Sequence, residues 1–280
     1  RRCGGRPRAH HLSRPQGRLR LITGLDHVVI AVRDIAHAAA YETLLGAEAT
    51  PVVTQDDISR SLIVTNNIAV EFMAPSGPRA SRLAAALEDG GEGLKSLVFA
   101  TTDIERLRTR CERVGLEPEA ISARDQVRSF RANTERTHGV RLFFVEPTET
   151  PVAHAAVRGL DHIVVRTPDA ERAAALYGAR LGLDMRLDRE VMGRRLMFFR
   201  CGDAVVEIVH DETLSDRRDK LWGLSWRVAD ADIERARLAA AGLNVSEVRA
   251  GAKPGTRVFT VRDKTCGVPT LMLETRPKRD

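Results

Sequence analysis

Apolar and polar residues alternate along this chain in a pattern that repeats four times. Each repeat opens with a short apolar strand, passes an acidic residue, and continues as an amphipathic helix that ends at glycine. An Asp side chain accepts hydrogen bonds from the exposed N–H groups at a helix start, and Gly adopts the left-handed conformation just past a helix end. The predicted strand–helix units span residues 28–46, 97–115, 163–182 and 224–242.

Three short strand-like runs follow each helix. They lie near 49–53, 61–65 and 68–73 in the first unit, and near 185–189, 195–200 and 204–209 in the third. Asn66-Asn67 and Gly202-Asp203 supply the tight turns before the last strand of these two units. The pattern therefore predicts βαβββ units, repeated four times with a period of about 55–70 residues.

The first and third units share a longer motif. Gly-Leu-Asp-His ends at His27 and returns 135 residues later, ending at His162. Each copy is followed by an apolar segment with one acid, Glu71 or Glu207. A lone carboxylate among apolar neighbours is costly, so His, Arg or a metal ion must pair with it. Without a cation, either Glu would have a raised pKa and could act as a general base, which makes both candidate catalytic residues.

Composition and charge limit the classes of protein to consider. A chain of 280 residues with 43% hydrophobic and 29% charged residues fits a soluble protein of two domains. Residues 1–20 hold seven arginines and no acid, so the remaining chain is close to neutral despite the net charge of +6. Neither a nucleic-acid partner nor a membrane span is expected. Four widely spaced cysteines without a C-x-x-C pair favour a reducing, cytoplasmic location.

The two Leu-Asp-His strands, the helices that run from Asp to Leu-Gly, and the Glu strands resemble the vicinal oxygen chelate superfamily. This superfamily includes glyoxalase I, methylmalonyl-CoA epimerase, extradiol dioxygenases and bleomycin-resistance proteins, and residues 91–105 are most similar to its epimerase-like branch. The resemblance implies an α+β fold in which four βαβββ modules pair into two tandem eight-stranded open cups. The expected organisation is a disordered basic segment at 1–21, a first glyoxalase-like domain at 22–147, a linker at 148–157 and a second glyoxalase-like domain at 158–276.

The resemblance also implies that one divalent metal ion binds to the first and last strands of the modules. Its ligands would be His27, Glu71, His162 and Glu207. The second and fourth modules carry no ligand at the matching positions, which are Ser96, Phe143, Gly223 and Leu271. If adjacent modules pair, each cup holds one His and one Glu, fewer than a typical catalytic metal site supplies.

Three arrangements of these residues remain open. Water or substrate could complete a partial metal site in one cup. Modules one and three could instead face each other, within or between chains, and bring all four ligands together. Alternatively, each His and Glu could form a structural hydrogen-bonded pair without metal. Extradiol dioxygenase chemistry is disfavoured because it needs two His and one carboxylate, and Gly223 lies where the second His would be.

Arg128 and Arg257 occupy matching places in the second and fourth modules, in Arg-Ser-Phe and Arg-Val-Phe. A guanidinium group that faces the cavity would bind a substrate carboxylate or phosphate through two hydrogen bonds. The alternative is that both side chains point to solvent.

Two functions are consistent with these residues. The first is a metal-assisted lyase or isomerase that acts on a small acid, a thioester or a compound with vicinal oxygens. The alternative is a metal-free protein that binds a small molecule, as bleomycin-resistance proteins do. In both cases the partner is a small molecule and the protein is a monomer or homodimer. Fold alone does not decide between an enzyme and a binding protein.

Overall fold

The computed structural model describes residues 20–124, 126–147, 155–191 and 193–275. Most of the basic segment expected at 1–21, and residues 148–154 of the expected linker, lie outside these ranges. No helix in the described ranges is long and apolar enough to span a membrane.

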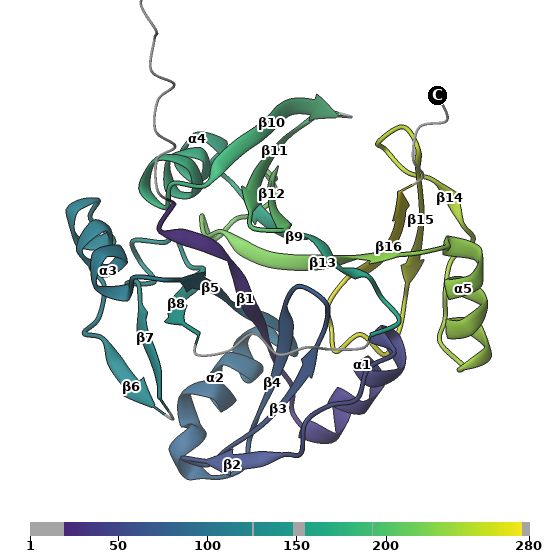
Figure 1. Ribbon diagram of the computed structural model, residues 1–280, viewed down its shortest axis with the longest axis horizontal. Helices are drawn as coiled ribbons and strands as arrows, with labels where there is room; N and C mark the ends of the chain where they lie inside the picture. Colours follow the sequence, from purple (N-terminus) through teal and green to yellow (C-terminus); the bar gives the residue numbers. More distant parts are fainter. Residues whose placement is uncertain (1–19, 125, 148–154, 192, 276–280) are drawn as a thin grey trace, which may run out of the picture.

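The described strands form two eight-stranded sheets with the same order (Figure 1). The first sheet has the order β2-β3-β4-β1-β5-β8-β7-β6, and the second has the order β10-β11-β12-β9-β13-β16-β15-β14. The first contains β1 (Ile22–Ala31), β2 (Val53–Gln55), β3 (Ile58–Val64), β4 (Ala69–Pro75), β5 (Gly93–Thr101), β6 (Ser122–Arg124), β7 (Val127–Arg131) and β8 (Arg141–Glu146). The second contains β9 (Gly159–Thr167), β10 (Asp184–Val191), β11 (Arg194–Cys201), β12 (Ala204–His210), β13 (Lys220–Val228), β14 (Arg249–Ala250), β15 (Thr256–Val261) and β16 (Thr270–Thr275).

Each sheet joins two adjacent modules. Strand β1 pairs with β5 in antiparallel fashion, and β9 pairs with β13 in the same way. The predicted α+β fold of four modules in two tandem eight-stranded cups is therefore confirmed. The arrangement in which modules one and three share a cup is wrong within one chain, because their strands lie in different sheets.

Four of the described helical segments follow the Asp residues that the sequence predicts as helix starts. The described helices are α1 (Ala38–Leu45), α2 (Ser81–Gly90), α3 (Ile104–Arg113), α4 (Ala170–Ala174) and α5 (Ala231–Ala240), with short helical turns η1 (Ile35–His37), η2 (Pro78–Ala80) and η3 (Ala175–Arg180, a π-helix). The carboxylates of Asp34, Asp103, Asp169 and Asp230 each accept a hydrogen bond from a backbone N–H in the first turn. Helix α2 was not predicted; it lies in the connection between the first two modules, where the guanidinium of Arg33 contacts it.

The two cups share one apolar core. It contains residues from both sheets and from the helices, including the fully buried Tyr41, Phe72, Tyr177 and Trp226. Arginines from one cup bind helix-end carbonyls of the other. The guanidinium of Arg237 in α5 donates to the Thr43 carbonyl of α1 at 2.8 Å, and that of Arg110 in α3 donates to a carbonyl of η3 at 2.8 Å. The cups therefore support each other through their helix-bearing faces.

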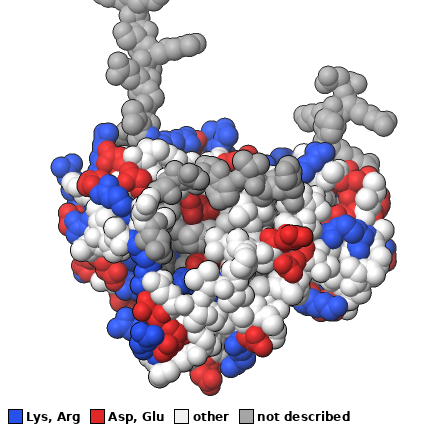
Figure 2. Space-filling view, turned by 60° about the horizontal axis from the view of Figure 1, so that its bottom comes forward, with Lys and Arg blue, Asp and Glu red and all other residues white. Residues whose placement is uncertain are grey.

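Charged side chains of both signs are mixed on the molecular face shown in Figure 2, around an uncharged area.

Cys111, Cys201 and Cys266 are buried free thiols.

Close backbone packing at the boundary between the cups leads to a first prediction. Gly202 has φ of 62°, and a Cβ there would lie 2.9 Å from both Gly24 Cα and the Thr23 carbonyl. We expect Gly202→Ala to lower the free energy of unfolding by at least about 2 kcal/mol, because backbone atoms must move. The control is Gly193→Ala, where φ is 74° and, apart from its chain neighbours, no described atom lies within 4 Å of the added Cβ. It should cost only about 1 kcal/mol for its left-handed backbone. If urea unfolding showed the same loss of unfolding free energy in Gly202→Ala and Gly193→Ala, the predicted clash would be contradicted.

Candidate functional site

In the first cup, His27 lies between two carboxylates. Its Nδ1 is 2.6 Å from Asp26 Oδ2, and its Nε2 is 3.5 Å from Glu71 Oε2. The guanidinium of Arg60 donates to Glu71 Oε1 at 2.7 Å. Burial opposes charging of the imidazole, but the hydrogen bonds and negative charges of Asp26 and Glu71 outweigh it and raise the pKa of His27 to about 9. Burial also opposes ionisation of Glu71, yet His27 and Arg60 hold its pKa below the usual range.

Apolar side chains form a cluster on this concave face. Val29, Val98 and Val145 are buried together, and Met73 and Phe143 pack against them. The two remaining ligand positions of this cup hold Ser96, which is buried, and Phe143. In the first cup, His27 and Glu71 are thus paired with each other and with Asp26 and Arg60, and this closed set of ion pairs lies beside an apolar cluster.

The second cup repeats the His–Glu pair without the arginine. His162 Nδ1 lies 2.8 Å from Asp161 Oδ2, and its Nε2 lies 3.1 Å from Glu207 Oε2. In the first cup, Arg60 on β3 lies opposite Met73 on β4. The matching place in the second cup, on β11 opposite Val209, holds Leu196.

The loss of that guanidinium changes the electrostatics of Glu207. Burial raises the pKa of this carboxyl and outweighs the opposing charges of His162 and Arg189. The two cups therefore hold the same His–Glu pair in different states, with Glu71 neutralised by two cations and Glu207 held less firmly in its ionised form.

A cavity of about 320 Å³ opens beside this second pair. Its lining comprises His162, Val164, Glu207, Val209, Trp222, Gly223, Leu224, Ser225, Arg249, Thr260, Pro269, Thr270 and Leu271. The four ligand positions inferred from the resemblance, His162, Glu207, Gly223 and Leu271, thus converge on one cavity. Only two of them carry a donor side chain.

The donor set does not fit a resident catalytic metal ion. Each cup supplies one imidazole and one carboxylate from these positions, and three protein ligands are usual. In the described part of the chain, no group of three or more His, Cys, Asp or Glu residues is arranged to hold a metal. A side chain at Gly223 is also hindered, because its Cβ would lie 2.8 Å from the Pro269 carbonyl oxygen. The two ligand pairs lie in separate sheets, so one chain does not form the four-ligand set His27, Glu71, His162 and Glu207.

The two predicted substrate-binding arginines lie on the faces that carry the helices. Arg128 pairs with Glu105 of α3 and, at 3.0 Å, with Glu146. Arg257 pairs with Asp232 of α5 at 2.7 Å and with Glu274 at 3.3 Å. Arg257 is absent from the lining of the second-cup cavity. These ion pairs connect sheet to helix, so the placement gives no support to a substrate role.

Two polar residues of the cavity, Ser225 and Arg249, were missed as site residues in the sequence. Ser225 follows Gly223 by two, which places both on one face of β13. That spacing was the available signal. Trp222 is 46% exposed, whereas Trp226 is fully buried in the core.

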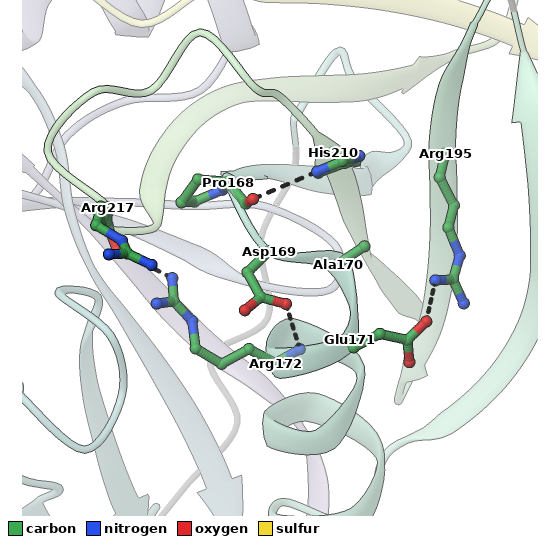
Figure 3. Close-up of a pocket in the computed structure, with 8 residues that line it drawn as sticks. All are labelled: Pro168, Asp169, Ala170, Glu171, Arg172, Arg195, His210 and Arg217. Atoms are coloured by element: carbon green, nitrogen blue, oxygen red, sulfur yellow. Dashed lines mark hydrogen bonds and ion pairs between the residues drawn. The ribbon is translucent and has the colours of Figure 1, made fainter.

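A separate cavity of about 380 Å³ lies at the start of α4 (Figure 3). Most of its charged groups bind one another. Asp169 accepts from the Arg172 N–H at 3.0 Å, Glu171 pairs with Arg195, and the Arg172 guanidinium donates to the Arg217 carbonyl at 3.1 Å. It shares no lining residue with the second-cup cavity.

Comparisons with known proteins cover both cups. Residues 25–158 match a model described as a glyoxalase-like domain, and residues 161–260 match the glyoxalase/bleomycin resistance protein/dioxygenase superfamily. A mutant of 4-hydroxymandelate synthase from Streptomyces coelicolor is similar in structure, with a TM-score of 0.72, 15% identity, and coverage of 92% of this chain and 94% of that chain.

Two further solved structures are similar to this chain. A xylose isomerase-like TIM barrel/4-hydroxyphenylpyruvate dioxygenase fusion protein has a TM-score of 0.68 and 15% identity, covering 92% of this chain and 49% of that chain. Methylmalonyl-CoA epimerase from Mycobacterium tuberculosis has 22% identity and a TM-score of 0.41, covering 46% of this chain and 95% of that one. No curated protein sequence matches the chain. At these identities, the two larger matches show the fold.

The ion pairs of His27 make stability depend on pH. Because folding raises the His27 pKa, its stabilisation is complete below about pH 6.5 and is lost as pH rises through about 9. We expect His27→Gln to reduce the free energy of unfolding by on the order of 3 kcal/mol more near pH 6 than near pH 10. Urea unfolding at both pH values measures this difference. His37→Gln, at a half-exposed imidazole, is the control and should change little at either pH. A pH-independent effect of His27→Gln would contradict the ion-pair assignment.

Proposed function

The chain belongs to the glyoxalase, bleomycin-resistance protein and dioxygenase superfamily, also called the vicinal oxygen chelate superfamily, and from this membership we propose that its second cup binds a small organic molecule without a resident metal ion. One observation carries the proposal. The two positions that would complete a ligand set hold Gly223 and Leu271, and a cavity of about 320 Å³ lies between them and the His162–Glu207 pair.

The lining of the cavity suits such a ligand. Small-molecule sites are concave and mostly apolar, with a few polar groups that orient the ligand. Val164, Val209, Trp222 and Leu271 supply the apolar surface here. The His162–Glu207 pair supplies hydrogen-bonding groups that point at the same space. The first cup, with its closed ion pairs and apolar cluster, has the structural role.

Metal-free proton transfer by Glu207 is the second candidate function. The observation that favours it is a carboxyl group that lines the cavity and whose pKa is raised by burial. Such a group could accept a proton from a carbon or oxygen acid bound beside it. His162, held by Asp161 and 3.1 Å from Glu207 Oε2, would orient this carboxyl group toward the substrate. This would be an isomerase- or lyase-type reaction, and Glu71 is less suited to it because Arg60 and His27 neutralise it.

Metal content separates this proposal from a metal-assisted enzyme. We expect protein purified without added metal to contain less than stoichiometric metal. Calorimetric titration with Zn²⁺, Ni²⁺ and Mn²⁺ should show no binding tighter than about 10 μM that depends on His162, because two protein ligands hold a metal weakly. The matched variants are His162→Ala and His27→Ala. Stoichiometric metal that is lost in either variant would contradict the proposal.

Filling the cavity should block ligand binding in the second cup. We expect Leu271→Trp to weaken binding of the neutral dye N-phenyl-1-naphthylamine by about tenfold or more, because the larger ring occupies the site. Dye fluorescence measures the affinity, and a melting curve checks that the variant is folded. Phe143→Trp, at the matching place in the first cup, is the control and should leave the affinity unchanged. The second cup would be the wrong site if Phe143→Trp alone abolished binding.

A further inference from the structure

The side chain of Ser225 is buried in the wall of the second-cup cavity without a hydrogen-bond partner. Ser225 is 1% exposed, and its Oγ has no partner among the described residues. Strand pairing places it directly opposite His162, on the strand next to the His–Glu pair. Buried hydroxyl groups are nearly always hydrogen-bonded in folded proteins, because an unsatisfied one costs free energy. A ligand that supplies the missing partner would remove this cost.

Arg249, an exposed residue at the edge of the cavity, is the second polar group of the wall that a ligand can meet. It is the only Lys or Arg among the described residues that line this cavity. In contrast to Arg60, Arg128 and Arg257, it has no ion pair with any described carboxylate. Arg249 lies opposite Val258 in the β14–β15 pair, whereas Arg257 lies opposite Ala250. Since opposing residues share a face, Arg249 belongs to the concave face and Arg257 to the face with the helices.

The charges of the cavity are separated in space. Glu207 lies on β12, next to β9 with His162 and Asp161, and Arg249 lies on β14 at the far edge of the sheet. Strands β13, β16 and β15 lie between β9 and β14. Asp161 and Glu207 have cationic neighbours of their own, whereas Arg249 has no carboxylate partner among the described residues and attracts an anionic group. The cavity therefore offers an anion one cation without a described carboxylate partner, at the edge of the sheet away from the His162–Glu207 pair.

We infer that the second cup recognises a small aromatic carboxylic acid, whose carboxylate binds Arg249 and whose polar substituent binds Ser225. A planar guanidinium matches a carboxylate through two parallel hydrogen bonds. The indole of Trp222, exposed at the cavity, provides a surface for an aromatic ring. This inference rests on the proposed binding function of the second cup and adds the chemical class of the ligand.

A matched pair of probes tests the carboxylate. The affinities of 4-fluorobenzoate and neutral 4-fluorobenzamide for the full chain are measured by ¹⁹F NMR. We expect the acid to bind about tenfold more tightly, and Arg249→Gln to remove this preference while the amide affinity stays unchanged. The control is Arg262→Gln, an exposed arginine outside the cavity lining that removes the same charge. It should leave both affinities unchanged.

A second pair of probes tests Ser225. We expect 2-fluoro-4-(hydroxymethyl)benzoate to bind more tightly than 2-fluoro-4-methylbenzoate, and Ser225→Ala to abolish the difference. In the absence of ligand, Ser225→Ala should melt no lower than the parent protein, because it removes an unsatisfied hydroxyl. Equal binding of the two probes would overturn the role of Ser225.

The outcomes distinguish this inference from the function on which it rests. Equal affinities for benzoate and benzamide, or an unchanged benzoate affinity in Arg249→Gln, would overturn the carboxylate inference and leave a neutral-ligand site. Loss of benzoate affinity in Arg262→Gln as well would show a general charge effect and also overturn it. If neither probe binds and Leu271→Trp does not alter binding of the neutral dye, the proposed function itself fails.

Discussion

The pairing of a buried carboxylate with an imidazole is the interaction on which both cups depend. Parallel pairing of β1 with β4, and of β9 with β12, brings Glu71 to His27 and Glu207 to His162. A carboxylate in such surroundings needs a hydrogen-bonding or charged partner to remain ionised. Asp26 and Asp161 in turn hold the imidazoles from the other side. Each concave face thus carries an Asp–His–Glu chain of hydrogen bonds and ion pairs.

The two cups differ in what surrounds this chain. In the first, Arg60 adds a second cation to Glu71, and apolar side chains including Phe143 form a cluster on the same face. In the second, Leu196 stands opposite Val209, and Gly223 and Leu271 border an open cavity. Since the two cups share one core and exchange helix-end hydrogen bonds, a rigid first cup stabilises the second. In the proposed function, the first cup has the structural role and the second cup binds the ligand.

Local patterns predicted the elements that local chemistry controls. The four Asp side chains cap the helices as expected, and the glycine predicted just past each helix has positive φ in the structure. The motif ending at His27 and His162 also located the polar pair of each cup. Helix α2 was missed because it lies in a connection outside the repeated pattern. The arginines predicted to bind substrate, Arg128 and Arg257, were chosen by sequence matching, which does not reveal the face of the strand.

By itself, the sequence determined the βαβββ repeat and the His–Glu positions, because strand periodicity, caps and a duplicated motif are local signals; the two-cup fold followed from the family resemblance. Only the tertiary structure decided which modules share a cup, that Arg60 reaches Glu71, and that Arg249 rather than Arg257 faces the cavity. These facts depend on strand register between residues far apart in the chain. A shift of one residue in register exchanges the two faces of a sheet. For that reason the His–Glu pairs could be foreseen from the sequence, whereas the roles of Arg60, Ser225 and Arg249 could not.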